Sequence, residues 1–146
     1  YELPSIITCC SNNYGPYQHN EKLIPHLLRE ALHGRPLPIY GDGEQIRDWM
    51  HVQDHVRGLY LVLTLGQVGE TYNIGANNLL TNHQPLGIST FHQLITYVDD
   101  RAGHDRRYAV DSRKIQETLG WTPQIAFADG LMKTVDHYLY GDEAHD

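Results

Sequence analysis

The chain has 146 residues, 40% of them hydrophobic, which is enough for one core and too short for two full domains. Its formal net charge of -7 argues against nucleic acid as the main partner, although a small anionic ligand needs only a local basic cluster. No apolar run approaches the ~20 residues that span a bilayer, and no signal peptide is recognisable. We therefore expect a cytoplasmic protein with no membrane and no nucleic-acid partner.

Cysteine and histidine usage gives no sign of a metal site. Cys9 and Cys10 are adjacent, which disfavours a disulfide and lacks the spacing of a zinc site, so both are expected to be reduced thiols. The ten histidines are scattered from His19 to His145 without an H-E-x-x-H motif. We expect no bound metal.

The chain opens with an apolar, β-branched run from Leu3 to Cys10, which predicts a strand buried on both faces of a parallel sheet. Because no partner strand or helix precedes it, we expect a further part of the protein before it, or a fragment of a larger enzyme. The SNNYGP sequence of residues 11–16 follows at the carboxyl end of this strand, where open α/β sheets bind ligands. It is either a binding loop or an ordinary turn.

A helix is predicted next, because Leu23, Leu27 and neighbouring apolar residues share one face. Pro25 belongs in its first turn and Gly34 follows its end. Lys22 stands just before this helix, where it can reach a ligand phosphate or water.

The segment of residues 38–54 is the centre of the sequence. It contains a short strand, a turn in which Gly41 and Gly43 supply positive φ, and a second extended run that together predict a strand pair. Asp54 precedes an apolar stripe of helical spacing and is predicted to be the N-cap of a second helix.

Arg47 lies near the mouth of that predicted strand pair. Its guanidinium can make two parallel hydrogen bonds to a phosphate, or it can pair with Asp48 or Glu44 on a solvated turn. Trp49 is either a core residue or a platform for a ligand.

Further strands are predicted at residues 70–74 and 95–98, with Asn82 in a polar loop between them. Residues 100–108 then gather three arginines and a histidine, which form either a site for an anionic ligand or a solvated charged loop. In the tail, Asp111 is expected to cap a helix that stops at Gly120, and one amphipathic helix follows. The alternation of strands and helices predicts an α/β fold.

Eight motifs occur in the order SNNYGPY, EKLIP, LPIYGDGEQIRDW, HVQDH, GETYNIG, DRAGHDRRYAVD, LGWTP and GLMKTVDHYL. In this order the chain resembles the extended short-chain dehydrogenase/reductase superfamily, within the NAD-dependent epimerase/dehydratase family, and most closely the dTDP-glucose 4,6-dehydratases. The resemblance covers nearly the whole chain, and GHDRRYA is its most specific part. It implies the C-terminal, substrate-binding part of an extended Rossmann-type nucleotide-sugar enzyme, with one residual strand of the parallel sheet.

The resemblance implies two parts. Residues 1–16 correspond to the last part of the dinucleotide-binding sheet and residues 17–146 to a nucleotide-sugar-binding domain, with the N-terminal Rossmann half absent. That half would supply most of the NAD site, the partner surface of this chain and the contacts of a homodimer. No Gly-rich dinucleotide fingerprint and no Tyr-x-x-x-Lys pair are present, so no catalytic residue is expected in this chain.

The implied reaction converts dTDP-glucose into dTDP-4-keto-6-deoxyglucose by oxidation at C4, elimination of water across C5 and C6, and return of the hydride to C6. A related UDP-sugar epimerase or decarboxylase and a non-catalytic nucleotide-sugar-binding module are the alternatives.

The resemblance also implies ligand contacts, with Asn13 touching the cofactor. Asn12 and Arg47 would hold the sugar diphosphate, and Pro38 and Tyr40 would line the base. The implied substrate-binding residues are Asn12, Lys22, Leu23, Pro38, Tyr40, Arg47, Asn82, Arg101 and His104.

This chain departs from the family's pattern in two ways. Ala102 replaces a usual proline, and the stretch between Asn82 and Asp100 is shorter than usual or lacks residues.

Overall fold

The structure is a computed structural model that describes residues 3–82 and 93–141, so residues 83–92 of the shortened stretch lie outside the described part. The described helices are α1 (Leu23–Leu32), α2 (Val52–Leu65), α3 (Arg113–Leu119) and α4 (Phe127–Tyr140). The described strands are β1 (Ile7–Cys10), β2 (Asn12–Tyr14), β3 (Leu37–Tyr40), β4 (Ile46–His51), β5 (Thr71–Ile74), β6 (Leu79–Thr81), β7 (Ile95–Val98) and β8 (Arg107–Tyr108). This mixed arrangement confirms the predicted α/β class.

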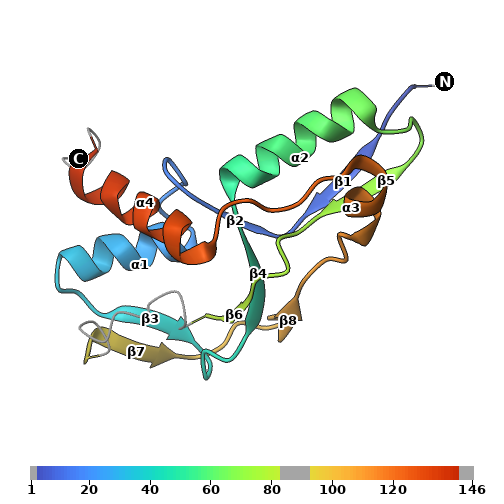
Figure 1. The fold of residues 1–146 in the computed structure, drawn as a ribbon. Coiled ribbons are helices and arrows are strands. Elements are labelled where there is room, and N and C mark those ends of the chain that lie inside the picture. The colour runs from blue at the N-terminus through green and yellow to red at the C-terminus, as the bar shows by residue number, and fades with distance from the viewer. Residues whose placement is uncertain (1–2, 83–92, 142–146) are drawn as a thin grey trace.

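The central strand of the fold is β4. It pairs in parallel with β2 and β8 and antiparallel with β6, whereas β1 pairs with β5 and β3 with β7, both in parallel. Figure 1 shows α2 and α3 beside the β1–β5 pair at one end, and α1 and α4 near the β3–β7 pair at the other. The strand β4 connects these two ends.

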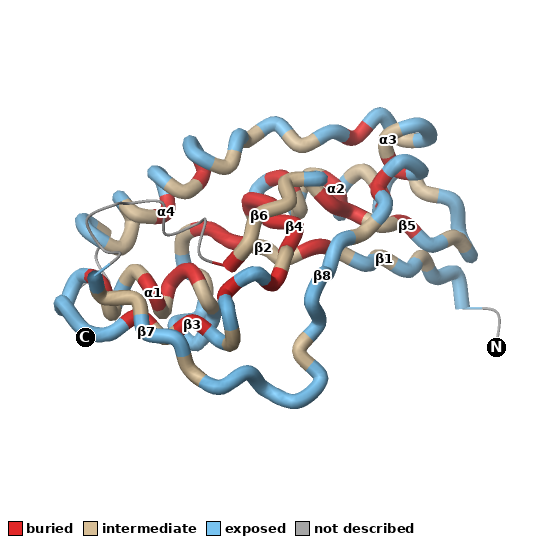
Figure 2. Tube along the Cα trace, turned by 90° about the horizontal axis from the view of Figure 1, so that it is seen from below, coloured by how far each residue is buried: buried red, intermediate tan, exposed pale blue. Residues whose placement is uncertain are grey.

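Buried side chains form three clusters, and the buried segments in Figure 2 follow β4, the inner face of α2 and the contact of α1 with β3. The cluster beside β1 and β5 contains Met50, Val62, Tyr72, Ile74, Ile115 and Trp121. The cluster between α1 and β3 contains Leu27, Ala31, Leu37 and Ile39. A third, of Tyr14, Ile24 and Trp49, lies between them and is covered by residues of α4.

The first strand differs from its prediction. It begins at Ile7 rather than Leu3, and it has a partner within the chain, because its four residues pair in parallel with β5. Neither face is fully covered, since Ile7 and Cys9 on one face are exposed and Thr8 and Cys10 on the other are only half-buried. The prediction of a strand buried on both faces and without a partner in this chain was wrong for the described residues.

For the glycine turn after β3, the predicted positive φ values are confirmed, but the predicted pairing of the two flanking strands was wrong. Gly41 and Gly43 have φ values of +58° and +74°, a region that costs a residue with a Cβ atom about 1–2 kcal/mol. The strands on either side, however, pair with β7 and with β2, β6 and β8 rather than with each other. The turn therefore connects two sheets and does not close a hairpin.

Asp54 does not cap α2. The cap residue is His51, whose imidazole accepts a backbone N–H two residues further on. Asp54 lies within the helix and is only 1% exposed. Its carboxylate accepts hydrogen bonds from the backbone N–H groups of Gln124 and Ile125 at 3.0–3.1 Å, and it forms an ion pair with Arg57 at 2.6 Å. This carboxylate joins α2 to the segment before α4.

The ends of some shorter elements were also compared with their predictions. The polar loop before Asn82 contains the strand β6. The N-cap position of α3 is Ser112, but the side chain that accepts the first backbone N–H of the helix, that of Arg113, is the Asp111 carboxylate at 3.0 Å, as predicted. Gly120 ends α3 with a φ of +65°, as predicted. Both Cys9 and Cys10 are free thiols. In the part of the chain that the structure describes, no helix combines the length and the apolar character needed to cross a membrane.

Candidate functional site

A cavity of about 770 Å³ opens among β2, α1, β3, β4 and the loop after β7. All nine residues expected to bind substrate line it: Asn12, Lys22, Leu23, Pro38, Tyr40, Arg47, Asn82, Arg101 and His104. These residues come from segments up to about ninety positions apart in the chain. The fold therefore brings together what the sequence analysis could associate only by resemblance.

Strand alternation explains how β3 and β4 present their side chains to this cavity. Pro38 and Tyr40 are two residues apart on β3, and Arg47 and Trp49 are two residues apart on β4, so each pair projects from one face of its strand. Trp49 is 4% exposed and belongs to a core cluster while also lining the cavity. Its indole therefore forms part of the cavity wall and packs at the same time against the core.

The cavity is basic, although the chain is acidic overall. Among the described residues, Lys22, Arg29, Arg47 and Arg101 line it together with one carboxylate, that of Glu21. Glu21 lies 3.4 Å from Lys22 in an exposed ion pair, an interaction of small energy in water. The remaining positive charge makes this cavity suited to an anion such as a diphosphate.

Arg47 is the most enclosed of these cations, with 8% of its surface exposed. Its Nη1 donates to the Ile46 carbonyl at 2.9 Å, and it forms no ion pair with the residues that the structure describes. Asp48 accepts the backbone N–H of Asn78 at 2.7 Å. Because Arg47 is buried within β4, the alternative that it lies on a solvated turn was wrong. Burial lowers the pKa of the Arg47 guanidinium, which indicates a charge that a bound anion would stabilise.

Three buried polar atoms in the cavity lining have no hydrogen-bond partner among the described residues. They are Oδ1 of Asn12, Oδ1 of Asn82 and Nε1 of Trp49. Buried polar atoms are normally hydrogen-bonded, and each such exception needs a physical explanation. A polar ligand in the cavity would provide these partners, with donors for the two amide oxygens and an acceptor for the indole.

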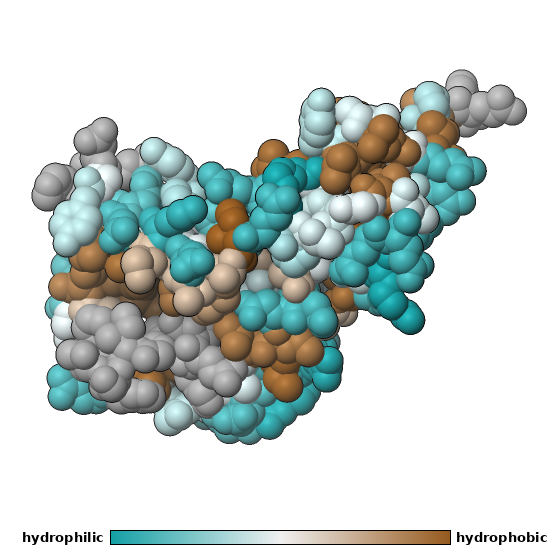
Figure 3. All heavy atoms as spheres, in the orientation of Figure 1, coloured by the Kyte–Doolittle hydropathy of each residue, from teal (hydrophilic) through white to brown (hydrophobic). Residues whose placement is uncertain are grey.

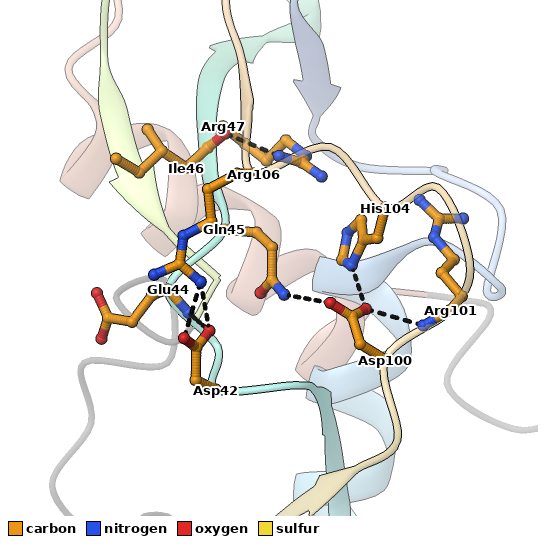
Figure 4. Close-up of polar contacts among 9 residues, drawn as sticks. All are labelled: Asp42, Glu44, Gln45, Ile46, Arg47, Asp100, Arg101, His104 and Arg106. Carbon is orange, nitrogen blue, oxygen red and sulfur yellow. Dashed lines mark hydrogen bonds and ion pairs between the residues drawn. The ribbon is translucent and has the colours of Figure 1, made fainter.

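The loop after β7 folds back on itself to place His104. Figure 4 shows the Asp100 carboxylate between Gln45 and His104. The carboxylate lies 2.6 Å from Nδ1 of His104. It also accepts hydrogen bonds from Nε2 of Gln45 at 3.0 Å and from the backbone N–H of Arg101 at 2.9 Å. The hydrogen bond from His104 contributes most to lowering the pKa of the Asp100 carboxyl. The loop is thereby tied to the turn that connects β3 with β4.

Asn13, the expected cofactor residue, does not line this cavity. Its side-chain amide donates to the Ser11 carbonyl at 3.0 Å and contacts Sγ of Cys10 at 3.5 Å, while its buried Oδ1 has no partner among the described residues. It lies just beyond the carboxyl end of β1, where parallel sheets bind ligands. The two groups of predicted residues therefore occupy neighbouring but separate places.

Several lining residues were not predicted: His19, Asn20, Glu21, His26 and Arg29. For two of them a signal exists in the sequence. His26 and Arg29 follow Lys22 at spacings of four and seven, which places them on the face of α1 that begins at Lys22.

The family model described as GDP-mannose 4,6 dehydratase matches residues 1–134 of the chain. The chain belongs to this family. Within it, the chain is 54% identical over 155 aligned positions to a dTDP-glucose 4,6-dehydratase of Neisseria gonorrhoeae, a match that covers 95% of this chain and 45% of the relative. The predicted resemblance to the dTDP-glucose 4,6-dehydratases is confirmed.

Solved structures of family relatives agree with this placement. The dTDP-glucose 4,6-dehydratase of Bacillus anthracis, solved in complex with NAD, superposes with a TM-score of 0.88 at 48% identity, over 98% of this chain and 47% of that one. A UDP-glucose 4-epimerase of Thermotoga maritima, solved with UDP-glucose, gives a TM-score of 0.84 at 30% identity, over 92% and 45%. The fold is thus that of the extended Rossmann-type dehydratases and epimerases.

The chain spans less than half the length of these relatives. The 155 positions of the Neisseria alignment also exceed the 146 residues of this chain, so that relative carries residues that this chain lacks.

Proposed function

We propose that the chain is the substrate-binding part of an NAD-dependent dehydratase that converts dTDP-glucose into dTDP-4-keto-6-deoxyglucose. The observation that carries this proposal is the basic cavity, which is lined by all nine of the residues expected to bind a nucleotide sugar. The degree of identity supports the substrate, since the chain is 54% identical to a dTDP-glucose 4,6-dehydratase and 30% identical to a UDP-glucose 4-epimerase.

Within the cavity, Arg47 and Asn12 are assigned to the diphosphate. Arg47 brings a charge with no ion-pair partner among the described residues, and a diphosphate can accept hydrogen bonds from a guanidinium and from the side-chain NH2 of an asparagine. The buried Oδ1 of Asn12 is an acceptor and would take a hydrogen bond from a donor elsewhere on the ligand. Pro38 and Tyr40 are assigned to the base. Lys22 and Arg101 are exposed cations at the rim that add to the attraction of the anion.

The cofactor proposal rests on the residues after β1. Oγ of Ser11 and Oδ1 of Asn13 are buried without a partner among the described residues, at the carboxyl end of a parallel strand, and these polar groups fit a dinucleotide bound there. NAD, when bound, accepts a hydride from the sugar and returns it. This chain's own contribution would be Asn13, which holds the edge of the cofactor site beside the substrate cavity.

We further propose that residues 1–16 complete a dinucleotide-binding sheet and residues 17–146 form the nucleotide-sugar-binding part of a longer polypeptide. Figure 3 shows apolar residues over α2, and the exposed side chains of this helix include Val56, Tyr60 and Leu63, at 57%, 65% and 81%. A surface of this kind is suited to cover by another part of a protein. An N-terminal Rossmann half would provide that cover and most of the NAD site.

The assembly is proposed to be a homodimer in the cytoplasm. The free thiols of Cys9 and Cys10 fit a reducing compartment.

The test is to express the complete protein from its native reading frame and to incubate it with dTDP-glucose, with UDP-glucose as the matched control. We expect a 4-keto-6-deoxy product, identified by mass and NMR, from dTDP-glucose alone. An epimerised UDP-sugar would favour the epimerase alternative. Binding of dTDP-glucose without any product, in a protein that holds NAD, would contradict the dehydratase and leave a binding module.

A further inference from the structure

The imidazole of His104 is held by a carboxylate that itself does not line the cavity. The side chain of His104 is 6% exposed, and Oδ1 of Asp100 lies 2.6 Å from its Nδ1. Among the described residues Nε2 of His104 has no hydrogen bond, and His104 lines the cavity while Asp100 does not. The two ring nitrogens therefore face different surroundings.

The chemistry of this contact determines which nitrogen carries the proton. The hydrogen bond from His104 lowers the pKa of Asp100, and the carboxylate also accepts from the Arg101 backbone and from Gln45. An ionised carboxylate only accepts hydrogen bonds, so Nδ1 of His104 must be the donor. In the neutral imidazole the other nitrogen, Nε2, is then an acceptor.

We propose that Asp100 is a positioning residue that holds His104 in the Nδ1–H tautomer, so that Nε2 accepts a hydrogen bond from an O–H or N–H group of the nucleotide sugar. This inference rests on the proposed function for the identity of the ligand, but the tautomer itself does not. It separates His104 from the cations of the cavity: Arg47 and Arg101 bind anionic oxygen, and His104 recognises a donor group.

The Asp100 carboxylate is itself fixed from the β3–β4 turn. Gln45 is 2% exposed and donates to Oδ2 of Asp100. A Cβ atom added to Gly41 would lie 3.1 Å from that oxygen and from Nε2 of Gln45. Tyr40 meets the His104 ring edge-on, with ring centroids 6.2 Å apart. The close approach that Gly41 allows therefore contributes to orienting a residue of the cavity wall.

The tautomer is tested first, without any ligand. The complete protein is labelled with ¹⁵N-histidine and examined by NMR at about pH 9, where imidazole groups are generally neutral, with His104→Ala assigning the signals. We expect the Nδ1–H tautomer of His104 in the wild type and the Nε2–H tautomer, or a mixture, in Asp100→Ala. An Nε2–H tautomer in the wild type would overturn the proposal, whatever the protein's substrate.

The role in recognition is tested by a double-mutant cycle on the Kd of dTDP-glucose. Asp100→Ala and His104→Ala should each weaken binding by roughly tenfold, the size of one lost hydrogen bond. Combined, they should weaken it no further, because Asp100 acts through His104. Independent, multiplying effects would overturn the positioning role, and so would an unchanged Kd in His104→Ala. If the wild type fails to bind dTDP-glucose, the proposed function fails while the NMR result still decides the tautomer.

Asp42→Ala is the matched control, because Asp42 is a nearby exposed carboxylate that pairs with Arg106 at 2.8 Å and does not line the cavity. It should leave both the Kd and the His104 tautomer unchanged. Comparison of dTDP with dTDP-glucose then locates the donor group. An equal loss for both ligands in His104→Ala places it on the nucleotide, and a loss for dTDP-glucose alone places it on the sugar.

Discussion

The basic side chains at the two ends of the molecule are neutralised differently. At the end built from α2, α3 and β5, each of three cations contacts a carboxylate: Arg57 with Asp54, Arg113 with Asp111, and Lys114 with Glu70. At the cavity end, Lys22 and Arg29 also contact carboxylates, those of Glu21 and Glu30. Arg47 and Arg101, however, form no ion pair with the described residues, although the chain carries more acidic than basic side chains.

This difference separates stabilising charge from ligand-binding charge. A buried cation without a carboxylate costs free energy unless another partner takes its place, so Arg47 is a poor choice for stability and a good one for binding an anion. The cations near α2 and α3 are already paired with carboxylates of the same chain. The comparison predicts that substitutions at one end change the free energy of unfolding and that substitutions at the other change affinity.

The largest effect is expected from Asp54→Ala in the α2 end. The substitution leaves the backbone N–H groups of Gln124 and Ile125 and the guanidinium of Arg57 without their acceptor, which should lower the free energy of unfolding by about 3 kcal/mol. Urea denaturation of the complete protein measures this loss. Asp136→Ala, at an exposed position of α4, is the control and should be nearly neutral. An altered Kd for dTDP-glucose in folded Asp54→Ala would break the separation between the two ends.

The converse is expected for Arg47→Ala. Removal of the guanidinium should weaken binding of dTDP-glucose about 100-fold, or roughly 2.7 kcal/mol, because a charge-assisted contact to the diphosphate is lost. The free energy of unfolding should stay the same or rise, since a buried charge is removed. Isothermal titration calorimetry measures the Kd, with Arg106→Ala as the control, because Arg106 is exposed and already pairs with Asp42. Equal losses in the two variants would show that the cavity attracts the ligand only by its general field.

A pair of glycines tests whether the β3–β4 turn serves stability alone. Gly34 and Gly41 have similar φ values, +63° and +58°, but a Cβ atom at Gly34 meets nothing within 4 Å, whereas one at Gly41 meets Asp100 and Gln45. Replacement by alanine should cost about 1–2 kcal/mol of stability at each position for the left-handed backbone. Only Gly41→Ala should also weaken dTDP-glucose binding, by a few fold, as the displaced Asp100 disturbs His104. Unchanged affinity in Gly41→Ala would argue that the turn does not act on the site.

Elements with local causes were predictable from the sequence. The helix at Leu23–Leu32 follows from its apolar spacing and its proline in the first turn, and the positive φ values of Gly41 and Gly43 follow from the turn chemistry. The residues that line the cavity were predicted instead from the resemblance to a family whose motifs occur in the same order. Periodicity alone could not have joined Asn12 to His104.

The errors share a physical cause, which is that the deciding partner lies far along the chain. Asp54 is a residue type that favours helix N-caps, but its carboxylate oxygens accept hydrogen bonds from N–H groups about seventy residues further along the chain. The short strand β6 exists because β4 offers an edge to pair with. That Arg47 is buried beside the cavity, and not on a solvated turn, likewise depends on the strands that flank β4.

The smallest effect concerns two surface pairs, one at each end of the molecule. Arg35 on the cavity side lowers the pKa of Glu30 to about 2, mainly through its hydrogen bond, and Arg113 does the same to Asp111, also to about 2. A carboxyl whose pKa is lowered in the folded state contributes stability above its unfolded pKa and loses it as the pH falls through the folded value. Both contributions should therefore be present above about pH 4.5 and disappear towards pH 2.

Glu30→Gln and Asp111→Asn should each make the free energy of unfolding less dependent on pH in that window and leave its pH dependence above pH 5 unchanged. The effects should be modest and reduced by salt, because both pairs are at the surface. Urea unfolding at several pH values, at low and high salt, measures them. Because neither carboxylate lines the cavity, the Kd for dTDP-glucose should not change. A change in Kd for Glu30→Gln alone would show that its neighbour Arg29, which does line the cavity, depends on that carboxylate for its placement.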